Sequence, residues 1–226
     1  MTLTGVLMPL LLMAGAAVGI GLWWRRRDIS RRAAFEALAA RRGWSLNVGK
    51  QSLGRPGTLR LASRGGPEWR LTVRGTVVGP DRITDFHADE PQWTNGYLLV
   101  TSADPDEDTD DDAEDAGLPA PARDVRATVH AMGAEGMGAD LMGMGRIDAP
   151  PGLIALATAD PTLRVDLSDL ARTLSDSAFG DGPQAARAVM LLGPDGLRLR
   201  LGQPLRNADR AEAFIDLAQA IGRTVG

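Results

Sequence analysis

Three side chains with the chemistry of metal ligands alternate along one short segment of the chain. Asp85, His87 and Asp89 are separated by one residue each. On a β-strand, alternate side chains lie on the same face, so this spacing would bring two carboxylates and an imidazole together. These groups bind divalent metals, and His130 is the only other histidine. The spacing matches no dedicated metal motif, and a solvated loop explains it as well. The sequence therefore predicts no metal site, with Asp85, His87, Asp89 and His130 as the nearest approach to one.

An acidic segment follows, and it resembles a calcium loop only in part. Asp104, Asp106 and Asp108 match the first three ligand positions of an EF-hand loop, but Thr109 stands where that loop needs glycine. The nine acidic residues of the segment are Asp104, Asp106, Glu107, Asp108, Asp110, Asp111, Asp112, Glu114 and Asp115. Blocks of like charge repel and stay solvated, which predicts a disordered loop over residues 103–121.

The remaining chain is basic, with 25 basic against 20 acidic residues outside the acidic segment. Arg60, Arg70 and Arg74 alternate with apolar residues and would give one hairpin a basic face. Arg198 and Arg200 are the corresponding exposed residues of a second hairpin. The sequence leaves open whether the acidic segment contacts a basic partner or these arginines of its own chain.

Other chemistry has few candidates in this chain. Four methionines, Met132, Met137, Met142 and Met144, lie in a glycine-rich stretch, where irregular spacing favours adaptable packing or a protein contact over Cu(I) binding. There is no cysteine, and Lys50 is the only lysine. No serine-hydrolase elbow, phosphate-binding loop or zinc-protease motif occurs. The sequence thus predicts no cofactor and favours a protein that is not an enzyme.

The elements that would position these residues form an α+β pattern. Alternating or continuous apolar residues mark candidate strands at 44–48, 59–61, 69–73, 97–100, 125–131, 153–157, 189–192 and 197–201. Turn residues at 64–67 and 193–196 predict two hairpins. Helical periodicity appears at 29–42, 167–174 and 208–223, with Asp166 or Ser168 and Asn207 as caps. The predicted fold is an antiparallel sheet of about six or seven strands with packed helices, after an N-terminal transmembrane helix.

The transmembrane prediction rests on an uncharged run at residues 3–24. A helix of that length spans about 33 Å, which is enough for a hydrocarbon core of about 30 Å. Trp23 and Trp24 would lie at the membrane interface, and Arg25, Arg26 and Arg27 would stay cytoplasmic. This predicts a single-pass protein of a bacterial inner membrane, with the N-terminus outside and the C-terminal domain in the cytoplasm.

Two further expectations concern this run. Gly15 and Gly19 have the small-xxx-small spacing that can pair membrane helices, so they are candidates for a homodimer contact. Small residues at 14–17 would also permit signal cleavage, although no basic residue precedes the apolar run as a secretory signal requires. A cleaved, exported domain therefore stays open as an alternative.

The sequence predicts two parts, a membrane anchor with its basic flank at 1–27 and a cytoplasmic α+β domain at 28–226. We expect a non-enzymatic accessory or interaction domain at the cytoplasmic face of the membrane. Its expected partners are the lipid bilayer and a protein partner or a second copy. Nucleic acid is not expected, because the basic strands lack stacking aromatic residues apart from Trp69. The alternative is an enzyme that acts on a membrane-associated substrate through Asp85, His87 and Asp89.

Overall fold

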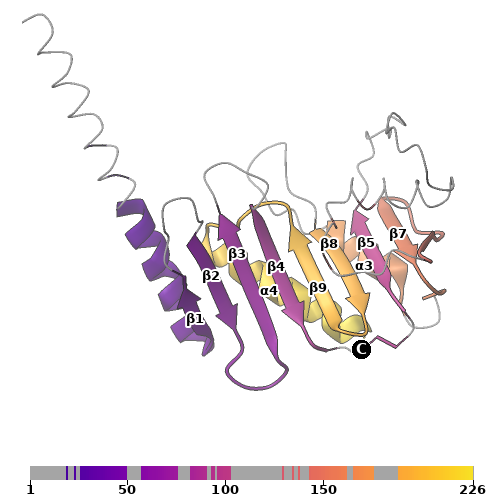
Figure 1. Ribbon diagram of the computed structural model, residues 1–226, viewed down its shortest axis with the longest axis horizontal. Coiled ribbons are helices and arrows are strands. Elements are labelled where there is room, and N and C mark those ends of the chain that lie inside the picture. Colours follow the sequence, from indigo (N-terminus) through magenta and orange to yellow (C-terminus); the bar gives the residue numbers. More distant parts are fainter. Residues whose placement is uncertain are drawn as a thin grey trace, which may run out of the picture.

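The fold is built on one antiparallel sheet (Figure 1). The computed structural model describes residues 19, 23, 26–49, 57–75, 82–90, 93–94, 96–102, 129, 134, 137, 143–161, 165–175 and 188–225. Within them, nine strands pair in the order β1-β2-β3-β4-β9-β8-β5-β7-β6. The strands are β1 (Ser45–Val48), β2 (Gly57–Ala62), β3 (Trp69–Gly75), β4 (Ile83–Ala88), β5 (Leu98–Ser102), β6 (Gly145–Arg146), β7 (Leu153–Ala157), β8 (Ala188–Gly193) and β9 (Gly196–Leu201).

The prediction of six or seven strands was wrong, because β4 and β6 have weak apolar patterns. β4 turns Thr84, Phe86 and Ala88 to the core, so it offers only one large apolar side chain on that face. β6 has two residues, both exposed. The strand predicted through Val129 is wrong at that residue, which is helical.

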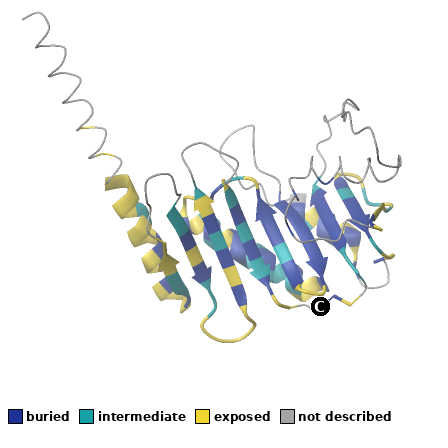
Figure 2. Ribbon diagram, viewed as in Figure 1, coloured by how far each residue is buried: buried dark blue, intermediate teal, exposed yellow. Residues whose placement is uncertain are grey.

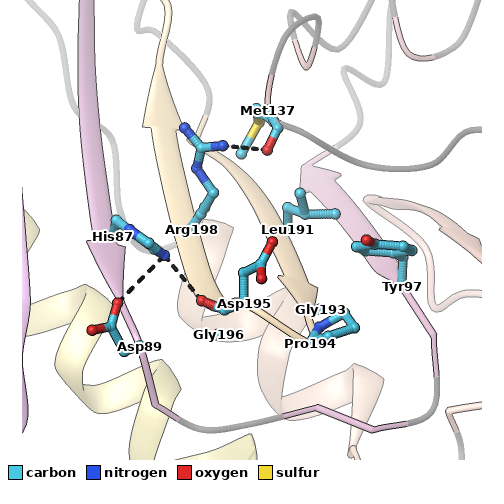
Figure 3. A pocket seen from close by; sticks show the side chains of 10 residues that line it. All are labelled: His87, Asp89, Tyr97, Met137, Leu191, Gly193, Pro194, Asp195, Gly196 and Arg198. Carbon is cyan, nitrogen blue, oxygen red and sulfur yellow. Dashed lines mark hydrogen bonds and ion pairs between the residues drawn. The ribbon is translucent and has the colours of Figure 1, made fainter.

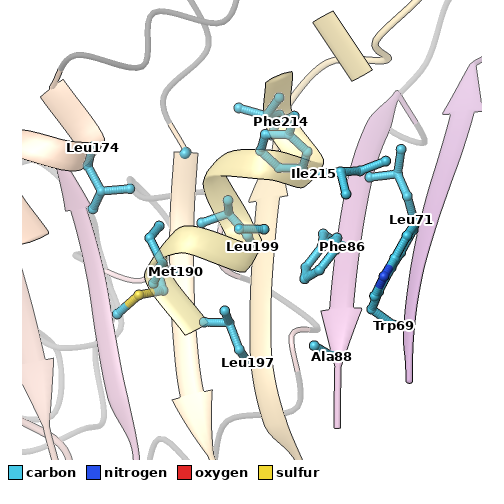
Figure 4. Packing of buried hydrophobic residues seen from close by; sticks show 14 of the residues in the cluster. Trp69, Leu71, Phe86, Ala88, Leu174, Met190, Leu197, Leu199, Phe214 and Ile215 are labelled. Carbon is cyan, nitrogen blue, oxygen red and sulfur yellow. The ribbon is translucent and has the colours of Figure 1, made fainter. Parts of the chain in front are cut away.

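Helices pack against one face of the sheet, which we call the inner face. They are α3 (Leu167–Ser175), α4 (Ala208–Val225) and a helix described at residues 26–42, here called the N-terminal helix. Phe35 of the N-terminal helix and Phe214 of α4 are fully buried in the same cluster as Phe86 and Leu199 of the sheet. Figure 4 shows Phe214 and Ile215 lying over these strand residues. The inner face and its helices thus form the main core.

The opposite, outer face is covered only in part. Along β2 and β3, buried Leu61, Leu71 and Val73 alternate with exposed arginines, because only the inner face is packed. β8 is buried at every residue. The burial of its outer side chains comes from a second hydrophobic cluster, in which Val189 and Leu191 pack with Val129, Ala134 and Met137. Figure 2 shows the resulting change from mixed to nearly complete burial across the sheet. The outer face is therefore covered over β8, β5 and β7.

The ends of α3 and α4 follow the capping expectations. Asn207 Oδ1 accepts a hydrogen bond from the Asp209 amide at 2.7 Å, which confirms Asn207 as the cap of α4. At α3, Asp166 Oδ1 accepts from the Ser168 amide at 2.8 Å, so Asp166 is the cap.

An ion-pair network joins the N-terminal helix to α4. Glu212 of α4 accepts from Arg41 at 2.5 Å and from Arg42 at 2.6 Å, and Arg42 also contacts Asp216. Partial burial works to raise the pKa of the Glu212 carboxyl. The hydrogen bond from Arg42 and the charges of Arg41 and Arg42 outweigh it, and hold this pKa below its ordinary value of 4.5.

This network predicts a pH-dependent contribution to stability. A carboxyl whose pKa is lowered by folding stabilises the protein above its unfolded pKa, and this contribution is lost as the pH falls through the folded pKa. We expect Glu212→Gln to lower the free energy of unfolding by about 1 kcal/mol at pH 7. The difference from the parent should shrink progressively below about pH 4.5, as urea titrations at several pH values would show. Glu36→Gln, at an exposed pair with Arg32, should cost about 0.5 kcal/mol or less. An equal cost for both variants would contradict the prediction.

The transmembrane prediction is contradicted. No helix in the described part of the chain is long and apolar enough to cross a membrane. The N-terminal helix carries eight charged side chains between residues 26 and 42, including Arg26 and Arg27, so no apolar span can form there. The predictions of a single-pass protein and of an inner-membrane location with a cytoplasmic domain therefore fail with it.

Several expectations fall outside the described residues. They include most of the apolar run at 3–24, with Gly15, Trp24 and Arg25, the predicted loop at 103–121, and His130. Trp23 and Gly19 are described as exposed helical residues.

Candidate functional site

Arginines of strands β2, β3 and β9 gather on the outer face of the sheet. Arg60 lies opposite Thr72 in the register, Arg70 opposite Ala62 and Arg74 opposite Thr58. These residues alternate with buried core residues, so Arg60, Arg70 and Arg74 share the outer face and are all exposed. Arg198 and Arg200 of β9 lie on the same side of the sheet, opposite His87 and Asp85 of β4. We call this surface of five arginines the arginine face.

Asp85 is the carboxylate at the centre of the arginine face. Its Oδ2 lies 2.9 Å from Arg198 Nη2 and 3.7 Å from Arg200 Nη2. The Asp85 side chain is 17% exposed and that of Arg200 only 9%. Burial lowers the pKa of the Arg200 guanidinium, the charge of Asp85 raises it, and the charges of Arg198 and Arg74 lower it further. Among the residues that the structure describes, cations thus outnumber the carboxylate in this cluster.

The expectation that Arg198 and Arg200 are exposed was wrong. Arg200 is buried, and the side chain of Arg198 is 26% exposed. β9 lies between β4 and β8 in the middle of the sheet, and Arg198 Nη1 donates to the backbone oxygen of Met137, which lies over the outer face. The alternation of residues in the sequence predicted the correct face of the sheet for these two arginines. It did not predict the hydrogen bond from Arg198 to Met137.

His87 is held by two hydrogen bonds that fix its tautomer. Arg70 Nη2 lies 2.6 Å from His87 Nδ1, and His87 Nε2 lies 3.0 Å from the backbone oxygen of Asp195. A guanidinium only donates and a carbonyl only accepts, so Nδ1 must accept and Nε2 must carry the proton. Both nitrogens of the imidazole are therefore in use. Asp89 Oδ1 stands 3.7 Å from Nε2, beyond hydrogen-bond distance.

A pocket of about 370 Å³ opens beside His87, at the turn between β8 and β9 (Figure 3). Its polar side consists of His87, Asp89, Asp195 and Arg198, and its apolar side includes Tyr97, Met137 and Leu191. The turn between β8 and β9 packs closely against Tyr97 and against the end of β4. A Cβ on Gly193 would lie 2.6 Å from the Tyr97 ring, and Gly196 has a φ of +95° beside the backbone of Ala88. Glycine at these two positions therefore lets the turn form one wall of the pocket.

The predicted alternation of Asp85, His87 and Asp89 is only partly reflected in the structure. Asp85 and His87 share the outer face of β4, whereas Asp89 follows the last residue of the strand. Asp85 points to the arginines of β9, and only His87 and Asp89 come near each other. Among the residues whose placement is described, no three side chains of metal-binding type form a group that could hold a metal ion.

Sequence reasoning missed Asp195 as a partner of His87. The residues 193–196 were recognised as a turn, but the pairing of β4 with β9 spans more than a hundred residues of chain. No local pattern signals such a contact.

Comparison with protein-family models, with curated proteins and with solved structures finds no match to this chain. The site is therefore interpreted from its own chemistry.

Proposed function

We propose that the protein is a non-enzymatic interaction domain that binds an acidic protein segment on its arginine face. The observation that carries this proposal is the exposure of Arg60, Arg70 and Arg74 on two adjacent strands. The nearby carboxylate, Asp85, is directed at Arg198 and Arg200. Exposed guanidinium groups attract carboxylates and hold them with paired hydrogen bonds.

Binding fits this face better than catalysis does. A general base needs a nitrogen or oxygen that can reach the proton of a substrate. Both nitrogens of His87 are used by Arg70 and Asp195. Asp85 is likewise engaged, in the ion pair with Arg198. These polar groups support the shape and charge of the face.

An acidic protein segment also fits better than a nucleic acid. Sheets that bind single-stranded nucleic acids place aromatic rings on the binding face for base stacking. The aromatic residues of β3 and β4, Trp69 and Phe86, point to the core, where their rings stack at a centroid distance of 5.8 Å. The outer positions of β2 and β3 carry arginine, threonine and alanine instead.

A charge-reversal experiment tests this proposal. The double variant Arg60→Glu/Arg74→Glu should bind fluorescent polyglutamate about tenfold more weakly than the parent at low ionic strength, measured by anisotropy. Two attractive pairs become repulsive in this variant, and both positions are exposed, so the fold should persist.

The matched control is Arg32→Glu/Arg172→Glu, which makes the same charge change at side chains that are 63% and 70% exposed on helices. It should bind polyglutamate within about twofold of the parent, apart from long-range screening effects. An equal loss in the control would show that only net charge matters. Tighter binding to anionic phospholipid vesicles or to single-stranded RNA than to polyglutamate would contradict the proposed class of partner.

A further inference from the structure

The exposed arginines of the arginine face are spaced regularly along the strands. Arg70 and Arg74 are four residues apart on β3, which corresponds to about 13 Å. Arg60 on β2 lies opposite Thr72, halfway between them. Along the strand direction, the three guanidinium groups therefore start from Cα positions that repeat at about 7 Å.

An extended peptide has the same repeat. Its side chains alternate between two sides, so every second residue faces the same way at intervals of about 7 Å. A segment lying along β2 and β3 with an acidic residue at every second position would place one carboxylate against each of Arg70, Arg60 and Arg74. Long arginine side chains can span the lateral step of about 4.8 Å between the two strands.

On this spacing, and resting on the proposed function, we propose that the partner segment is extended and acidic at every second residue. Charge complementarity selects the acidic partner, and the 7 Å repeat selects its pattern. The segment runs along β2 and β3, and its other side chains face away from the sheet. A partner with an acidic residue only at every third position turns successive carboxylates to opposite sides and meets only one arginine at a time.

Two peptides of identical composition test the pattern with the full-length protein. The probe is Ser-Asp-Ser-Asp-Ser-Asp-Ser, and the control is Asp-Ser-Ser-Asp-Ser-Ser-Asp, which in extended form turns its middle carboxylate to the opposite side. We expect the probe to bind about fivefold more tightly than the control, because two more exposed ion pairs form. In Arg60→Ala, which removes the central arginine, this preference should fall to about twofold or less.

The outcomes separate this inference from the proposed function. Equal affinity for the two peptides, or a preference that Arg60→Ala leaves unchanged, would overturn the alternating pattern and leave the proposed function intact. Failure of both peptides and of polyglutamate to bind would overturn both. Circular dichroism of Arg60→Ala should match the parent, because this side chain is exposed.

The chain itself contains the same pattern, with acidic residues at positions 104, 106, 108, 110, 112 and 114. A variant of the full chain with amides at these six positions distinguishes this segment from a separate partner. We expect its affinities for probe and control to rise by the same factor, as the change in net charge requires. A larger rise for the probe than for the control would overturn the proposed partner in favour of the chain's own segment.

Discussion

Replacing Gly196 by alanine is expected to lower the free energy of unfolding by about 3 kcal/mol or more. Gly196 has a φ of +95°, which L-residues adopt only at a cost. A Cβ built there would lie 2.1 Å from the backbone oxygen of Ala88 and under 3 Å from backbone atoms of Asp89. Backbone atoms cannot rotate away, so the turn or the end of β4 must move.

Gly66→Ala is the control that isolates the steric part of this cost. Gly66 also has a positive φ, of +80°, but no atom lies within 4 Å of the added Cβ. Gly66→Ala should therefore lower the free energy of unfolding only by the cost of the positive φ, about 1–2 kcal/mol. Urea unfolding of both variants measures the difference. Equal costs would mean that the contact between the turn and β4 is looser than the structure shows.

Gly196→Ala should also disturb the hydrogen bonds of His87, because it displaces the turn between β8 and β9. The backbone oxygen of Asp195 accepts the hydrogen bond of His87 Nε2, and Gly196 follows it directly. Displacement of the turn would therefore release one side of His87, which an NMR spectrum of the imidazole would register in the folded variant. The turn and the arginine face are thus physically connected through His87 and Arg70.

Local patterns predicted the hairpins of this fold well. Leu59 and Leu61 alternate before a turn, and Leu71 and Val73 alternate after it, which is how β2 and β3 pair in the structure. Leucines at 197, 199 and 201 marked β9 in the same way. In each case the strand turns apolar residues to the core and polar residues to the other face, so apolar and polar residues alternate in the sequence.

The patterns failed where distant segments supply the surroundings. β4 pairs with β9, and this pairing places Asp85 beside Arg198 and Arg200. Nothing near Asp85 in the sequence indicates an arginine partner more than a hundred residues away. The uncharged run at 3–24 and its arginine flank predicted a membrane span, but no helix in the described part of the chain is long and apolar enough to cross a membrane.

Asp85→Asn is expected to lower the free energy of unfolding by about 2–4 kcal/mol. The substitution keeps the shape of the side chain and removes the negative charge between Arg198 and Arg200. Removing one partner of a largely buried ion pair is costly, because the arginine loses the attraction of Asp85 while it stays desolvated. The Arg200 side chain is only 9% exposed, so water can do little to solvate its charge after the negative charge of Asp85 is removed. Asp89→Asn, at a side chain that is 61% exposed, is the matched control and should change stability by about 0.5 kcal/mol or less.

The same variant should bind acidic ligands more tightly than the parent, although it is less stable. Loss of the central carboxylate makes the net charge of the arginine face more positive by one unit, which strengthens its attraction for carboxylates. At low ionic strength, the affinity for polyglutamate should rise about threefold to tenfold, and added salt should reduce the gain. Opposite signs in stability and binding would show that Asp85 stabilises the fold at the expense of binding on this face. A variant that lost both stability and affinity would instead indicate that Asp85 holds the arginines in the geometry that the ligand needs.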